Sequence, residues 1–156
     1  MKSKGTGRKS NRMQLYQFDG TPKYIMEYAE FACGILGLDR LRGDINIFMR
    51  PTLDGSMYGY CAGDGDEADI YIAQKRFGEK VPRKYHYLTV GHELTHARQF
   101  LKRELAEEET DDGFTMWKGR KIKYDPTDET NCPWEIEAVE YEKKIWKEWK
   151  QKYLYK

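Results

Sequence analysis

The chain has 156 residues, a length typical of one domain, and its 39% hydrophobic residues, including 14% aromatics, can form a sizeable core. A formal net charge of +1 excludes a general attraction to nucleic acid, and no apolar stretch is long enough for a membrane span. Three widely spaced cysteines without a CxxC pair indicate neither a disulfide framework nor a zinc knuckle, so we expect a cytoplasmic protein.

The N-terminal segment differs in composition from the rest of the chain. Residues 1–12 are polar and basic and contain no apolar run, so we expect a disordered tail and no secretory signal. Its charge would allow weak binding to nucleic acid. Residues 13–156 are expected to form a single domain.

The first predicted element is a helix that Thr21 caps, with Pro22 as its first residue and Gly37 at its end. Its core-facing residues recur at helical spacing: Tyr24, Tyr28, Phe31 and Ile35. Alternation of polar and apolar residues then predicts three strands, separated by turns rich in Gly and Asp. These strands cover residues 44–49, 57–62 and 68–73.

A long helix is predicted over residues 83–107, and it carries the sequence His92-Glu93-Leu94-Thr95-His96. Its buried stripe comprises Val90, Leu94, Ala97 and Leu101, and Leu105 extends it. Because residues four apart lie on the same helix face, His92 and His96 can bind one ion from the same side. Glu93 lies at the rim of this face. This HExxH pattern is typical of zinc metallopeptidases, in which the glutamate is the general base. We assign the third histidine, His86, to the surface.

The third zinc ligand must be sought further along the chain, since catalytic zinc takes three protein ligands and no histidine follows His96. An acidic connection after residue 107 and a small hairpin over 114–124 precede a final helix that begins near residue 131. The carboxylates of this helix are candidates: Glu135, Glu137, Glu140 and Glu142. Contact through the small Ala138 would direct Glu135 at the ion, and Glu137 is the alternative.

HExxH followed by Glu-x-x-Ala on a later helix, here Glu135 to Ala138, resembles the gluzincins, in which that glutamate is the third zinc ligand. The C-terminal half is also similar to small metallopeptidases encoded by bacteriophages and bacteria, which would place the protein in a host cytoplasm. The resemblance implies an α+β, zincin-like (minigluzincin) fold. In that fold a small, twisted, mainly antiparallel sheet packs on the HExxH helix, and its edge strand holds an extended substrate. N-terminal and C-terminal helices complete the domain. Gluzincins often carry Asp or Asn after the alanine to orient a zinc-bound histidine. This chain has Val139, so another acceptor is required.

These residues predict hydrolysis of peptide bonds in a protein or peptide substrate, with one Zn²⁺ per chain and Glu93 as general base. Tyr124 and Tyr141 are candidates for stabilising the oxyanion. Two alternatives remain. One is a non-catalytic scaffold or binding protein that zinc stabilises. The other is a protease that docks on nucleic acid through the basic tail and the Lys-rich segment 143–156.

Overall fold

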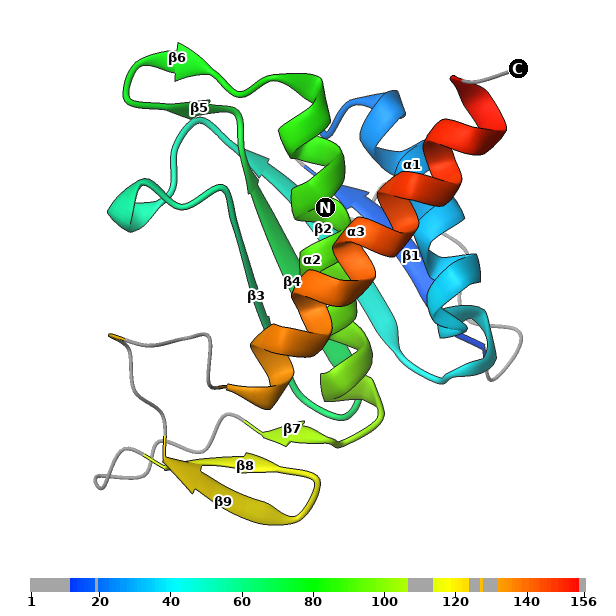
Figure 1. Cartoon of the computed structure of the whole chain (residues 1–156), viewed down its shortest axis with the longest axis vertical. Helices are drawn as coiled ribbons and strands as arrows, with labels where there is room; N and C mark the ends of the chain where they lie inside the picture. The colour runs from blue at the N-terminus through cyan, green and yellow to red at the C-terminus, as the bar shows by residue number, and fades with distance from the viewer. Residues whose placement is uncertain (1–11, 19, 107–113, 124–126, 128–131, 155–156) are drawn as a thin grey trace.

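The computed structural model describes residues 12–18, 20–106, 114–123, 127 and 132–154 (Figure 1). Both helices and strands occur in these residues, in agreement with the predicted α+β class. The larger elements are β1 (Gln14–Phe18), α1 (Lys23–Leu36), β2 (Asp44–Arg50), β3 (Gly59–Gly63), β4 (Glu67–Ala73), α2 (Arg83–Leu101) and α3 (Pro133–Tyr153). The smaller ones are 3-10 helices η1 (Leu38–Arg40) and η2 (Asp54–Ser56), and strands β5 (Lys75–Arg76), β6 (Glu79–Lys80), β7 (Leu105–Ala106), β8 (Phe114–Trp117) and β9 (Arg120–Lys123). Except for Arg12, the predicted tail lies outside the described residues, and so does the acidic connection.

The main sheet has the strand order β1-β2-β4-β3. The pairs β1–β2 and β2–β4 are parallel and only β3–β4 is antiparallel, so the expectation of a mainly antiparallel sheet is wrong. Strand β1 was not predicted. Helix α1 connects it to β2 by the kind of crossover that a parallel pair requires. The chain then passes through η2 to place β3 outside β4, at one edge of this sheet.

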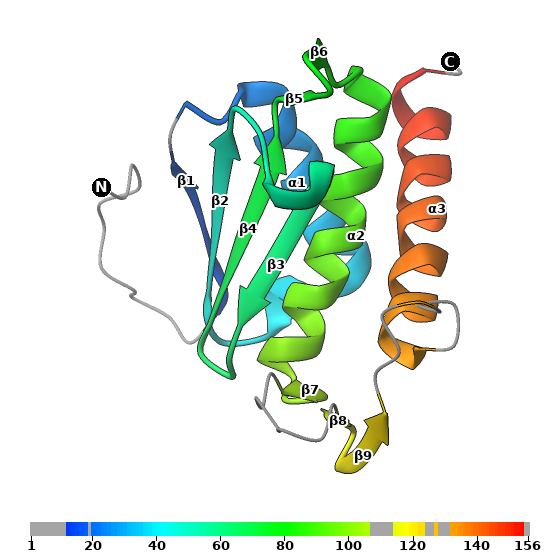
Figure 2. The same cartoon turned by 90° about the vertical axis from the view of Figure 1, so that its left-hand side faces the viewer.

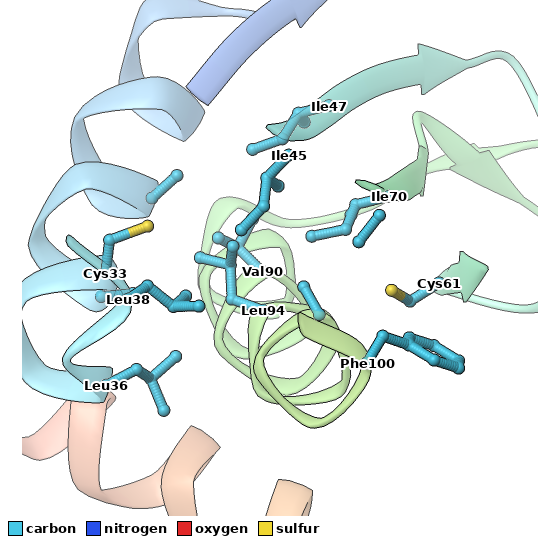
Figure 3. Close-up of a cluster of buried hydrophobic side chains, with 14 of the residues drawn as sticks. Cys33, Leu36, Leu38, Ile45, Ile47, Cys61, Ile70, Val90, Leu94 and Phe100 are labelled. Atoms are coloured by element: carbon cyan, nitrogen blue, oxygen red, sulfur yellow. The ribbon is translucent and has the colours of Figure 1, made fainter. Parts of the chain in front are cut away.

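Helices α1 and α2 cover one face of the sheet, and α3 packs on α2 on the side away from the sheet (Figure 2). Alternate residues of the strands point to the helices, and Ile45, Ile47 and Ile70 are completely buried there. They meet Val90 and Leu94 of α2 in the core (Figure 3). One face of α2 therefore packs against the sheet. A neighbouring face contacts α3 and carries the two histidines of the HExxH segment.

Helix α2 ends at Leu101 rather than at residue 107, which corrects the predicted boundary. Arg103 takes up a left-handed conformation (φ 58°), and the amides of Arg103 and Glu104 donate to the carbonyl oxygens of Phe100 and Gln99. This pair of bonds is a Schellman motif, which ends helices and usually contains glycine. No glycine is present at this helix end, so its position could not be predicted from the residue types. Leu105 still packs in the core, but from β7.

His86 is buried, with 3% of its surface exposed, so its assignment to the surface is wrong. Its Nε2–H donates to the carbonyl oxygen of Ala73 in β4 at 2.9 Å, and its Nδ1 accepts from the Tyr24 hydroxyl of α1 at 2.6 Å. Burial lowers the pKa of His86, which keeps the ring neutral for these two roles. The residue thus joins the first turn of α2 to both the sheet and α1.

Of the two predicted ends of α1, the C-terminal one is confirmed and the N-terminal cap is wrong. Gly37 terminates α1 in the left-handed conformation, as expected. Thr21 does not cap the helix, because Pro22 holds the N-cap position. The Thr21 hydroxyl instead bonds with the carbonyl oxygens of Phe18 and Ile47, which ties the start of α1 to two strands.

The three cysteines, Cys33, Cys61 and Cys132, are buried, and none is part of a disulfide. Burial raises the pKa of the Cys33 thiol to about 12. None of the helices in the described residues has the length and apolar character needed to cross a membrane.

Candidate metal centre

His92 and His96 lie one turn apart on α2, and both contact α3 and line the cleft that β3 also borders. Their ring centroids are 4.9 Å apart and the rings are nearly perpendicular. Atoms of His92, Glu93 and His96 that can ligate a metal all lie within 4.8 Å of one another. The HExxH segment therefore forms a cluster that could hold a metal ion, as the helical spacing predicted.

Glu135, in the first turn of α3, brings a carboxylate to both histidines. Its Oε2 lies 3.1 Å from His92 Nε2 and its Oε1 lies 3.0 Å from His96 Nε2. Ala138, one turn later, is completely buried on α3, and α3 packs along α2. The two helices approach closely at Gly91, where an added Cβ would lie 3.4 Å from Glu142 Cα. Two imidazole nitrogens and one carboxylate thus converge on one place, and this is a donor set that suits an open zinc site.

Charge complementarity holds these three side chains together. Although burial lowers the pKa of His92, hydrogen bonds with Glu135 and Glu142 raise it to about 10. The pKa of His96 is also raised, because the Glu135 hydrogen bond outweighs burial. Burial opposes ionisation of Glu135, but both imidazoles hold its pKa far below the usual value. The carboxylate is therefore ionised, as a metal ligand must be.

The other nitrogen of each imidazole is occupied by an acceptor. Glu142 Oε1 accepts from His92 Nδ1–H at 2.9 Å, and Gln99 Oε1 accepts from His96 Nδ1–H at 2.8 Å. Both rings consequently present Nε2 to Glu135. Such acceptors fix the tautomer and the orientation of metal-binding histidines. Glu142 thus provides the carboxylate acceptor for a zinc-binding histidine that Val139, at the usual position of this acceptor, cannot provide.

The roles of Glu142 and Gln99 as acceptors for the two imidazoles were not predicted, although their spacing in the sequence indicates them. Gln99 follows His96 by three residues, and Glu142 follows Glu135 by seven, so each shares a helix face with a predicted ligand. Glu142 was considered only as a ligand.

Glu137 faces a different neighbour from Glu135. Its Oε1 lies 3.2 Å from Nη2 of Arg98 and 3.2 Å from Nε2 of Gln99. Gln99, which is completely buried, also donates to the carbonyl oxygen of Trp134 at 3.0 Å. Glu137 therefore belongs to a polar network that joins α2 to α3, and the fourth candidate, Glu140, is exposed.

Glu93 is 5% exposed, and its Oε2 has no hydrogen-bond partner among the described residues. Burial raises the pKa of the Glu93 carboxyl group. The neighbouring imidazoles of His96 and His92 lower it, but the net shift is upward. Strand β3 passes close to it at Gly59, where an added Cβ would lie 2.4 Å from Thr89 Cγ2 and 3.2 Å from Glu93 Cγ. A glycine is required there for β3 to lie against this part of α2. A buried carboxylate that has a raised pKa and an oxygen without a hydrogen-bond partner among the described residues suits a general base.

These side chains lie in a cleft of about 730 Å³, a volume typical of ligand sites. Strand β3 and helix α3 lie on opposite sides of α2 (Figures 1 and 2). Residues of β3, α2 and α3 line the cleft. Among the described residues that line the cleft are His92, Glu93, His96 and Glu135.

Of the two proposed oxyanion residues, Tyr141 alone lies in the part of the chain that the structure describes. Tyr141 is absent from the lining within the described residues, and its ring lies under the Arg98 guanidinium at 4.3 Å. Tyr124 lies outside the described residues. The tyrosines that do line the cleft are Tyr58, Tyr60 and Tyr85.

Comparison with protein-family models, curated proteins and solved structures finds no match to this chain. The function is therefore inferred from the geometry and chemistry of the cleft.

Proposed function

We propose that this protein is a zinc-dependent metallopeptidase with a zincin-like (minigluzincin) arrangement of its active site. The observation that carries the proposal is the carboxylate of Glu135 within 3.1 Å of Nε2 of both HExxH histidines, at the floor of an open cleft. His92, His96 and Glu135 would hold the ion, and Glu142 and Gln99 would orient the two imidazoles.

A bound zinc ion would polarise the scissile carbonyl and lower the pKa of a coordinated water. Glu93 would accept a proton from the attacking water and deliver it to the amine that leaves. Its burial supports this role, because a raised pKa brings the carboxyl group closer to the pH at which it must both take and return a proton.

The substrate would be a protein or a peptide in extended form. Strand β3 is at the edge of the main sheet, and residues 57–61 line the cleft beside Glu93. An extended segment placed along β3 would lie across the histidines, with backbone hydrogen bonds to the sheet edge.

The test is hydrolysis of denatured casein by the zinc-loaded protein, followed by mass spectrometry of the products. Glu93→Gln should retain zinc and lose at least about 100-fold in rate, because the amide cannot take up the proton. Glu30→Gln, an exposed change on α1, should keep both zinc and activity. A zinc-loaded Glu93→Gln protein with unchanged activity would refute the proposed role.

The two alternatives predict different results. A non-catalytic scaffold would have four protein ligands on zinc, with Glu93 as the nearest candidate for the fourth, and would cleave nothing. A protease that docks on nucleic acid would show strongly salt-dependent DNA binding.

A further inference from the structure

The wall of the cleft at the start of α2 is formed by large apolar side chains that reach solvent. Met57, Tyr58 and Tyr85 are 40%, 37% and 43% exposed, and all three line the cleft together with the partly buried Leu88. Apolar residues gathered in a concave site mark a surface that binds a partner or a ligand.

Two of these residues form an ordered pair. The rings of Tyr58, next to β3, and Tyr85, on the first turn of α2, are stacked with centroids 5.7 Å apart. The guanidinium of Arg76 lies 3.7 Å from the Tyr58 centroid, and the Tyr85 backbone is tied to Thr89 by a 2.7 Å hydrogen bond. The pair joins β3 to α2 and presents a fixed aromatic surface at one end of the cleft.

This surface is close to the reacting groups. Leu88 precedes His92 by one helical turn, a rise of about 6 Å. An extended peptide advances about 3.3 Å per residue, so the apolar wall faces the first or second residue beside the bond to be cut.

The charges of the cleft are unfavourable for an acidic side chain. The lining residues in the described chain include three carboxylates, Glu93, Glu135 and Glu142, but no lysine or arginine. When all three carboxylates are ionised, a bound doubly charged ion neutralises two of their negative charges. One negative charge therefore remains in the cleft. The Arg76 guanidinium lies over the Tyr58 ring and donates to the Ser56 carbonyl oxygen, and it is not among the described lining residues. An aspartate or glutamate of the substrate would therefore lose its hydration in the cleft without a lysine or arginine of the described lining to pair with.

We propose that the cleft selects peptides with an aromatic or aliphatic side chain beside the scissile bond, packed against Tyr58, Tyr85 and Leu88, and rejects peptides with an acidic one. This inference rests on the proposed function, because it names the substrate class of the same site.

The experiment uses the zinc-loaded full chain and synthetic octapeptides that share one Gly-Ser frame and differ at the two central positions, which carry Phe-Leu, Ala-Ala, Lys-Lys or Glu-Glu. Mass spectrometry gives the rate and the site of cleavage. The Phe-Leu peptide should be cleaved with a kcat/KM at least about tenfold above that of the Glu-Glu peptide.

Two variants test the residues themselves. Leu88→Arg places a cation in the wall and should raise kcat/KM for the Glu-Glu peptide while lowering it for Phe-Leu. Tyr85→Ala, at an exposed position, should reduce Phe-Leu cleavage more than Ala-Ala cleavage. The matched control Leu154→Arg, at the exposed end of α3, should leave the preference unchanged.

The outcomes separate the two proposals. Cleavage of the Glu-Glu peptide at the rate of the Phe-Leu peptide, or an unchanged preference in Leu88→Arg, would overturn the substrate assignment and leave the peptidase intact. Cleavage of no peptide, and no hydrolysis of casein, would overturn the proposed function itself.

Discussion

Gln99 is the residue whose replacement should separate the role of the histidine network from that of the ligands. It is completely buried, accepts from His96 Nδ1–H at 2.8 Å and donates to Trp134 O at 3.0 Å. Gln99→Met keeps the length of the side chain and removes these bonds. The main cost is the buried His96 N–H left without an acceptor, which we expect to lower the free energy of unfolding by about 1–3 kcal/mol.

The same change should weaken zinc binding, because His96 loses the group that fixes its ring. Loss of such an acceptor typically costs about 10–100-fold in metal affinity, which is about 1.4–2.7 kcal/mol. Urea unfolding in the presence of a chelator measures the first effect, and competition with a chromophoric chelator measures the second.

The control is Gln151→Met, an exposed position on α3, which should change the unfolding free energy by less than about 0.5 kcal/mol. If Gln99→Met matched this control in stability and retained the zinc affinity of the unmodified protein, the orienting role of Gln99 would be refuted.

Two further predictions concern His92 and His86. Glu142→Gln keeps an acceptor near His92 Nδ1 but removes its charge, so zinc affinity measured by chelator competition should fall by about tenfold, and unchanged affinity would argue against this role. The folded-state pKa of His86 lies below its ordinary value of 6.5, so the unfolded state binds the extra proton first as the pH falls. The stability that neutral His86 contributes is thus complete above about pH 6.5 and is lost as the pH falls toward the folded-state pKa. Urea unfolding between pH 7.5 and pH 5 should consequently show a shallower pH dependence for His86→Gln than for the unmodified chain, and equal slopes would contradict the buried, neutral ring.

The features that were predictable from the sequence depend on local spacing. A four-residue interval on a helix is enough to place His92 and His96 on the same face. The prediction of Glu135 as the third ligand needed one further assumption, that the last helix approaches α2 closely at the small residue Ala138. A small residue within an apolar stripe can be recognised in the sequence, and Ala138 is completely buried.

The features that were missed depend on contacts between distant segments. The direction of β2 relative to β4 is set by how the chain connects them, which alternation of residues does not encode. His86 is buried because Tyr24 and Ala73 supply partners from other elements. Likewise, Arg103 ends α2 without the glycine that marks most helix ends.

The most direct test is the zinc content of the dialysed Glu135→Ala protein, measured by inductively coupled plasma mass spectrometry beside the unmodified chain and the Glu137→Ala control. We predict one zinc per chain in the unmodified protein and in Glu137→Ala, and its loss from Glu135→Ala, because Glu135 contacts both Nε2 atoms whereas Glu137 pairs with Arg98. Full zinc occupancy in Glu135→Ala, or an unmodified protein that binds no zinc, would contradict the proposed metal centre.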